Sequence, residues 1–203
     1  MSYAIDTIPY PHLRALDRVV CGGRGFVAWR IRRRTAGFRR QFDKHVATHT
    51  GLLVDFHGQL LIAEMLTDGL SIDTLERYLS QRSRYIISFR RSPVFDDEDK
   101  RERAQAIIAY VYRERLNMAE YDRRGVFSFV NKTFRQDPHK WYCSEFDCAL
   151  TAKFGCTYPH SFNVRPDPNQ SNPIGLQVGS VSPHDLQVCG GSWRTLTDDD
   201  FGT

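Results

Sequence analysis

Apolar runs bounded by turn residues predict the strands of this chain. Five runs fit strands: 18–20, 26–31, 46–55, 60–66 and 85–89. The first two flank Gly22-Gly23, and the third and fourth flank His57-Gly58. Because glycine in the second loop position is typical of a tight hairpin turn, we expect residues 46–55 and 60–66 to pair as an antiparallel hairpin.

Apolar residues at helical spacing predict three helices, over residues 71–80, 99–118 and 143–154. Ser71 is a candidate cap for the first helix, and Gly155 ends the third. Residues 157–192 are rich in proline, glycine, serine and asparagine, so we expect loops there with one or two strands. This mixed order predicts the α+β class, with a mostly antiparallel sheet.

The composition is that of one globular domain. The 203 residues are 41% hydrophobic and 26% charged, and a chain of this length buries a sizeable core without staples. We expect a single domain over residues 1–203, with a core at about 16–192 and a frayed acidic tail at Asp198-Asp199-Asp200. The sequence has no run of 18 apolar residues and no secretory signal pattern, so we expect no transmembrane segment and no signal peptide.

The cysteines favour a reducing compartment. They are Cys21, Cys143, Cys148, Cys156 and Cys189. Their number is odd and no CxxC pair occurs, so we expect free thiols in a cytoplasm rather than a disulfide framework.

Arginine dominates the basic residues. The chain has 23 arginines, five lysines and a net charge of +4. Seven of the arginines lie within residues 24–40, where Arg30, Arg32, Arg33 and Arg34 are densest. Guanidinium groups bind carboxylates and phosphates bidentately, so we expect an anion-binding patch that faces a lipid headgroup, a cell-wall polymer, a nucleic acid or an acidic protein. A solvated face is the simpler alternative.

A carboxylate interrupts an apolar strand at Glu64, inside the run LLIAEML. A buried carboxylate costs several kcal/mol unless a charged or hydrogen-bonding group meets it, so we expect a partner on the neighbouring strand. If His57-Gly58 form the hairpin loop, Glu64 lies opposite Gly51, and His49 is its diagonal neighbour on the same face. A His–Glu pair of this kind fixes the imidazole tautomer and supports its charged form. An ion pair that only holds the hairpin is the structural alternative.

Cys143 is the candidate nucleophile. It lies in WYCSEF, where an aromatic approach runs into a helical pattern, so we expect the thiol at a helix N-terminus. Free amides and the positive end of the helix dipole stabilise a thiolate there and could hold an oxyanion, although Glu145 in the first turn opposes the thiolate. A small buried hydrophobe is the usual role of a lone cysteine. Spacing alone does not bring Cys143 and His49 together.

At these residues the sequence resembles the circularly permuted branch of the NlpC-type, papain-like cysteine hydrolases, the YiiX/YebB-like group. Six elements follow that family's order: Leu16-Asp17-Arg18-Val19-Val20, Thr48-His49-Thr50-Gly51, Ala63-Glu64 with Asp68-Gly69-Leu70, Tyr121-Asp122, Tyr142-Cys143-Ser144-Glu145 and Val181-Ser182-Pro183-His184-Asp185-Leu186. The chain departs from the family pattern at Leu16, where the family has glycine, in the arginine-rich segment 24–40, and in the stretch 156–180.

The resemblance implies a papain-like fold, in which an antiparallel sheet or partial barrel packs against helices. It implies that Cys143 is the nucleophile, that His49 is the general base and then acid, and that Glu64 orients His49. Backbone N–H groups at Cys143 would form part of an oxyanion hole, with Tyr121 and Tyr142 as further oxyanion or substrate contacts.

The family also implies an activity and a setting. We expect hydrolysis of an amide or ester bond through an acyl-enzyme, in cell-wall peptides (peptidoglycan) or in acylated lipids or proteins, with no cofactor. Such proteins occur in bacteria and bacteriophages, so we expect a cytoplasmic or virion location, with phage structural proteins as candidate partners.

Three other interpretations remain open. The residues His139, Cys143, Cys148, Cys156 and His160 could form a zinc module, although their spacing lacks a CxxC knuckle. A papain-like scaffold could also serve as a non-catalytic structural or binding component, for example of a phage particle. Phe26, Trp29 and Phe38 could stack nucleic-acid bases between the arginines, but strand alternation would turn some of them to the core, so we do not expect nucleic acid as the partner.

Overall fold

The computed structural model describes residues 12–66, 69–80, 84–114, 120–121, 140–168, 172–179 and 181–197. Its strands are β1 (Arg18–Gly23), β2 (His49–Phe56), β3 (Gln59–Leu66), β4 (Gly69–Thr74), β5 (Arg84–Arg91), β6 (Glu120–Tyr121), β7 (Lys140–Trp141), β8 (Arg165–Pro166), β9 (Leu176–Gln177) and β10 (Arg194–Thr195). Its α-helices are α1 (Phe26–Thr35), α2 (Leu75–Ser80), α3 (Glu98–Arg113), α6 (Cys143–Lys153) and α7 (Pro183–Val188). Short 3₁₀ turns are η3 (Phe38–Arg40), η4 (Pro93–Asp96) and η5 (His160–Phe162).

A six-stranded sheet organises the chain, in the order β10-β5-β1-β2-β3-β4. All of its pairs are antiparallel. The β2–β3 hairpin turns at His57 and Gly58, whose φ angles of 53° and 81° are those of a type I′ turn. Leu52 pairs with Ala63 and Leu53 with Ile62, so the predicted hairpin and its register are confirmed.

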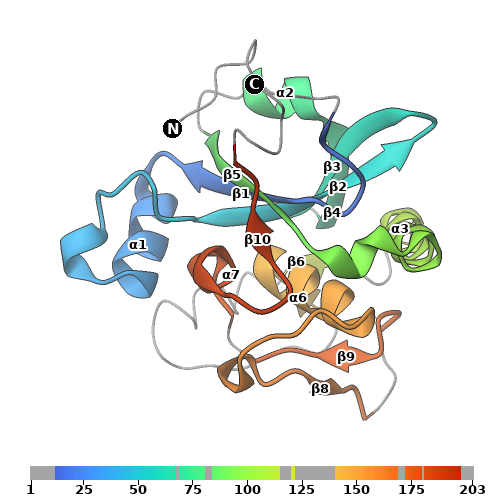
Figure 1. The fold of residues 1–203 in the computed structure, drawn as a ribbon. Helices are drawn as coiled ribbons and strands as arrows, with labels where there is room; N and C mark the ends of the chain where they lie inside the picture. The colour runs from blue at the N-terminus through green and yellow to red at the C-terminus, as the bar shows by residue number, and fades with distance from the viewer. Residues whose placement is uncertain are drawn as a thin grey trace.

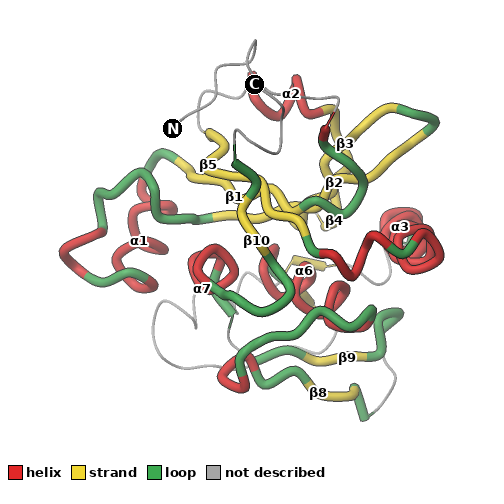
Figure 2. The backbone as a smooth tube through the Cα atoms, in the orientation of Figure 1, coloured by secondary structure: helices red, strands yellow, loops and turns green. Residues whose placement is uncertain are grey.

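Each face of the sheet is covered by a different part of the chain (Figures 1 and 2). Leu52, Val54, Ala63 and Met65 belong to a core cluster that they share with α3, α6 and the segment that contains α7. The alternate strand positions, including Leu53 and Ile62, belong to a second cluster with Leu75 and Tyr78 of α2. The protein is therefore an α+β structure in which an antiparallel sheet packs against helices.

Two predicted element types are wrong. Residues 26–31 form the start of helix α1 rather than a strand, because Gly25, with a φ of 97°, turns the chain out of β1. The buried residues of α1 are Ala28 and Arg32, which have the i, i+4 spacing of one helix face.

Residues 71–74 are the second wrong prediction, since they form the end of β4 rather than the start of a helix. Ser71 pairs with Glu64 of β3, and the hydroxyl of Thr74 accepts a hydrogen bond from the Arg77 amide at 3.1 Å. Thr74, not Ser71, therefore provides the side-chain cap, and helix α2 begins at Leu75.

The helices predicted at 99–118 and 143–154 are present, but the first ends at Arg113, with Glu114 as its C-cap, and residues 115–118 lie outside the described residues. α3 begins after Asp97, whose side chain accepts from the Lys100 amide, and α6 ends before Gly155, with a φ of 101°. The predicted loop region after residue 157 also contains α7, which Ser182 caps. Among the described residues, no helix is both long and apolar enough to cross a membrane.

Candidate active site

The His49–Glu64 pair lies where the hairpin register predicts it. His49 is the first residue of β2, and its Nε2 donates to Oε2 of Glu64 on β3 at 2.6 Å. Gly51 leaves little room there, since a Cβ on this residue would meet the Ala63 carbonyl oxygen and the Ile62 side chain, both at 3.0 Å. The glycine therefore allows β2 and β3 to approach closely two residues after His49.

Arg84, which no sequence pattern indicates, completes the environment of Glu64. Its Nη1 donates to Glu64 Oε1 at 2.7 Å, so each carboxylate oxygen of Glu64 meets one cationic partner. Burial disfavours the charged carboxylate, but His49 and Arg84 outweigh this effect and hold the pKa of Glu64 below its usual value. Arg84 begins β5 and pairs with Gly23 of β1, so no local sequence signal connects it with Glu64.

Cys143 is the first residue of α6, as predicted, and is buried. Burial opposes its ionisation, but attraction to His49, a hydrogen bond with the His49 side chain, and the backbone amides of Thr50 and Ser144 lower the pKa of the thiol below 9.0. Burial likewise opposes the charged imidazole, yet Cys143 and Glu64 together raise the pKa of His49 from 6.5 to about 10. The two groups therefore favour a thiolate–imidazolium pair.

The other cysteines have a different electrostatic environment. All five cysteines are buried free thiols. Burial raises the pKa of Cys156 to about 11, and it also raises the pKa values of Cys21 and Cys148. Cys143 and Cys156 are almost equally exposed, at 6% and 5%, so burial alone does not explain their opposite shifts.

The residues on either side of Cys143 are both hydrogen-bonded to the backbone of Val181. The Val181 amide donates to the Tyr142 hydroxyl at 3.2 Å, and the Ser144 hydroxyl donates to the Val181 carbonyl at 2.6 Å. The Tyr142 amide contacts Oε2 of Glu145 at 3.5 Å, which keeps that carboxylate at the helix N-terminus. These contacts fix the start of α6 against the segment that leads into α7.

A buried ion pair fixes α6 to the sheet one turn after Cys143. Arg18 of β1 donates through Nε and Nη2 to the two oxygens of Asp147, both at 2.7 Å. The same guanidinium donates to the Tyr158 hydroxyl at 2.6 Å and stacks on Trp193, 3.7 Å from the ring centroid. Arg18 and Asp147 are both inaccessible to solvent, so this pair sets the position of α6 on the sheet from inside the core.

The remaining predicted residues are placed as follows. Tyr121 lies on β6, which pairs in parallel with β7 just before Cys143, and Asp122 lies outside the described residues. Arg30, Arg33 and Arg34 are exposed on α1. Arg32 is not part of that exposed surface, because its side chain is buried and donates to the Gly23 carbonyl and the Tyr85 hydroxyl.

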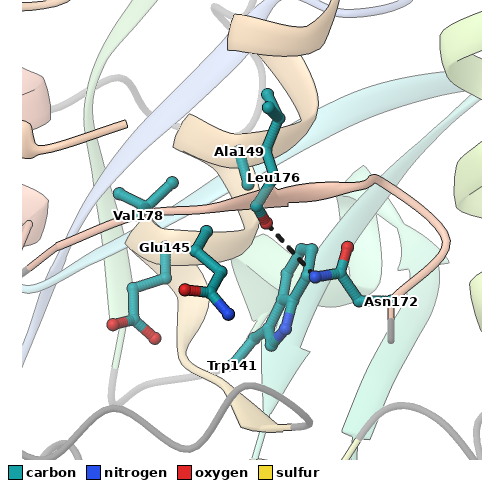
Figure 3. A pocket seen from close by; sticks show the side chains of 7 residues that line it. Trp141, Glu145, Ala149, Asn172, Leu176 and Val178 are labelled. Atoms are coloured by element: carbon teal, nitrogen blue, oxygen red, sulfur yellow. Dashed lines mark hydrogen bonds between the residues drawn. The ribbon is translucent and has the colours of Figure 1, made fainter. Parts of the chain in front are cut away.

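Within the described part of the chain, two cavities adjoin α6, and neither of these is lined by Cys143 or His49. The first lies between α6 and β9 (Figure 3) and is lined by Trp141, Glu145, Ala149, Asn172, Leu176, Gln177 and Val178. At about 10 Å³ it holds no more than a water molecule. The second measures about 280 Å³ and is lined by Ala152, Cys156, Tyr158, Pro159, His160, Asn163 and Val164. Across the described part of the chain, no group of three or more histidine, cysteine or acidic side chains could hold a metal ion.

Comparisons with known proteins identify the fold but not the activity. No family model and no curated protein matches the sequence. The structure resembles the crystal structure of metalloprotein yiiX from Escherichia coli O157:H7, DUF1105, with a TM-score of 0.59. The two chains are 14% identical over 92% of this chain and 97% of the other. At that identity the likeness concerns the fold, and it agrees with the YiiX-like part of the sequence resemblance.

Proposed function

We propose that this chain is a cysteine hydrolase of the permuted papain-like type, in which residues 1–203 form one catalytic domain. Cys143 is the nucleophile, His49 the general base and acid, and Glu64 the residue that orients His49. One observation carries the proposal. His49 interacts with both the Cys143 thiol and the Glu64 carboxylate, and the pKa values of Cys143 and His49 move in the directions that favour a thiolate beside an imidazolium.

The chemistry follows from these positions. The thiolate attacks a substrate carbonyl carbon and forms a carbon–sulfur bond, and the carbonyl oxygen becomes an oxyanion near the N-terminus of α6. The imidazolium then donates its proton to the leaving amine or alkoxide, which departs and leaves an acyl-enzyme. Water attacks this thioester while His49 accepts its proton, and the carboxylic acid and the thiol are released. Glu64 retains the imidazole orientation throughout, because Arg84 holds the carboxylate from the other side.

The substrate class follows from the sequence resemblance. The expected bond is an amide or ester in a bacterial cell-wall peptide or an acylated lipid or protein, and the setting is a bacterial cytoplasm or a phage particle. The exposed arginines of α1 favour an anionic substrate or surface.

Alkylation of Cys143 across pH tests the proposal without a known substrate. A thiol of pKa 9.0 is only about 0.1% ionised at pH 6, and Cys156, with a pKa of about 11, is ionised still less. We expect iodoacetamide to modify Cys143 at pH 6 at least tenfold faster than Cys156, measured by peptide mass spectrometry. The almost equal exposure of the two thiols makes Cys156 the matched control.

Two variants then connect reactivity with turnover. His49→Ala should slow alkylation of Cys143 at pH 6 to the rate of an ordinary thiol. Hydrolysis of a panel of acyl esters and cell-wall peptide amides should be lost in both Cys143→Ala and His49→Ala. Equal labelling of Cys143 and Cys156 at pH 6 would contradict the hydrolase proposal and favour the non-catalytic scaffold.

A metal-dependent function is the alternative to consider, because the structural neighbour is described as a metalloprotein. The residues of this chain do not fit that role where the structure describes them. Nε2 of His49 is bonded to Glu64, so the triad offers a metal only Cys143 and one imidazole nitrogen.

A further inference from the structure

Four large apolar side chains are exposed within one short stretch of the chain. They are Phe26, Val27, Phe38 and Phe42, with exposed fractions of 65%, 62%, 68% and 80%. Single exposed hydrophobic residues are ordinary on protein surfaces, but a concentration of them marks an interaction site. We call these four residues, together with the exposed Arg24, Arg30, Arg33, Arg34, Arg39 and Arg40, the α1–η3 surface.

Two arginines and two aromatic residues of this surface form a connected cluster with Trp29. The Phe26 and Trp29 rings lie 5.5 Å apart, and the Arg30 guanidinium lies 5.6 Å from the Phe26 ring centroid. The Arg33 guanidinium lies 5.5 Å from the Trp29 ring and 5.4 Å from the Phe38 ring, and so connects α1 with η3. Apolar and cationic groups therefore alternate over one continuous area.

The charge of this segment is opposite to that of the remaining chain. Residues 24–42 contain seven arginines and no acidic residue. Without these seven positive charges, the net charge of +4 becomes −3. Of the seven, Arg32 is turned inward and Arg40 pairs with Asp43 at 2.9 Å, so the others supply most of the positive field.

We propose that the α1–η3 surface docks onto a bilayer that contains anionic phospholipid. Phenylalanine and valine side chains enter the boundary between headgroups and acyl chains, while the arginines bind lipid phosphates. A nucleic acid fits the same charge less well, because Val27 has no π-face for stacking and arginines already cover the Phe26, Trp29 and Phe38 rings.

The α1–η3 surface belongs to a segment that begins and ends beside the candidate active site. Residues 24–48 connect the end of β1 to His49, the first residue of β2. Cys21 and His49 pair across these two strands, so both ends of the segment meet beside the candidate active site. The docking inference is independent of the proposed function, since it concerns binding alone.

Vesicle sedimentation with the full chain tests the inference. The protein should bind vesicles of phosphatidylcholine with 30% phosphatidylglycerol, and should not bind pure phosphatidylcholine vesicles. An arginine near an anionic surface contributes about 1 kcal/mol, so the double variant Arg33→Gln, Arg39→Gln should partition about 25-fold less strongly. The double variant Phe38→Ser, Phe42→Ser should lose binding by at least tenfold.

Matched controls lie elsewhere on the chain. Phe56 is 63% exposed at the end of β2, and the Arg77 side chain is 76% exposed on α2. Phe56→Ser and Arg77→Gln should bind vesicles as the wild type does. Cys143→Ala should also bind normally, which separates failure of docking from failure of the proposed hydrolase.

Three results would overturn the docking inference. The first is no binding to anionic vesicles at low salt. The second is an equal loss of binding in the control and the α1–η3 variants. The third is binding of a duplex or single-stranded oligonucleotide to the wild type, but not to the Arg33, Arg39 variant, by a protein that does not bind the vesicles. This result would identify a nucleic-acid site.

Discussion

Replacing Arg18 by methionine tests how strongly the buried ion pair holds α6 to the sheet. The substitution removes two hydrogen bonds of 2.7 Å to Asp147, one of 2.6 Å to the Tyr158 hydroxyl, and the stacking on Trp193. Asp147 would then be a buried carboxylate without its cation. Breaking a buried pair in this way costs about 3–5 kcal/mol, a large part of the about 5–15 kcal/mol that stabilises a domain.

Urea unfolding followed by circular dichroism measures this loss, and a double variant identifies its cause. Arg18→Met should lower the free energy of unfolding by about 3–5 kcal/mol and Tm by roughly 10 °C. Arg18→Met combined with Asp147→Leu should be more stable than Arg18→Met alone, because no buried charge remains unpaired.

The refuting results are specific. If Arg18→Met costs less than about 1 kcal/mol, the ion pair does not anchor α6. The single variant Asp147→Leu completes the comparison. If the free energies of unfolding lost by Arg18→Met and Asp147→Leu simply add in the double variant, the two residues are not energetically coupled, although they are in contact.

Three further predictions concern the candidate site. In Cys143→Ala the pKa of His49 should fall below about 10, because the attraction to the thiolate and its hydrogen bond are lost. NMR titration of the His49 imidazole measures this pKa, and an unchanged titration would contradict the prediction. Glu64→Gln should lower the free energy of unfolding by about 2 kcal/mol above pH 4.5. The difference from wild type in urea unfolding should shrink as pH falls, because the pKa of Glu64 is lowered on folding. A pH-independent difference would contradict this prediction. Gly51→Ala should cost about 1–3 kcal/mol in thermal unfolding, because its Cβ would meet the neighbouring strand at 3.0 Å; a Tm unchanged from wild type would contradict this.

The sequence predicts the parts of the site that depend on local geometry. A two-residue hairpin loop fixes the register of the strands beside it, so the His49–Glu64 pair follows from the position of His57-Gly58. The contact between Cys143 and His49 does not follow in this way, because it depends on how α6 packs against the sheet. Arg84 is hidden for the same reason, since it reaches Glu64 from a strand on the far side of β1.

The wrong strand prediction at residues 26–31 has a physical cause. A short alternation of apolar and basic residues has no unique period, and the arginines that interrupt it are also good helix formers. The deciding residue is Gly25, whose positive φ lets the chain turn away from β1 and begin α1. As a helix, the segment leaves Phe26 and Val27 in solvent, whereas alternation in a strand would have buried one of them.

Leu16 has a backbone conformation that is unusual for leucine. The resembled family has glycine at this position, and Leu16 has a φ of 66°, in the left-handed region that favours glycine. Its side chain is buried in the core that contains α6, and its amide donates to the Leu53 carbonyl at 2.7 Å. Packing and this hydrogen bond therefore hold a backbone conformation that leucine disfavours.

Most residues that carry the resemblance hold the scaffold rather than perform chemistry. Asp17 accepts two hydrogen bonds from Arg91, Ser182 caps α7, and Tyr142 and Ser144 bind Val181. A chain that had lost its nucleophile would therefore keep nearly the whole pattern and the fold. It follows that the pattern supports the architecture more strongly than the activity, and that the proposed activity depends on the environment of the Cys143 thiol. Cys143→Ala should accordingly unfold at the wild-type temperature within a few degrees while losing hydrolysis, which makes it the appropriate inactive control for the hydrolysis and vesicle experiments.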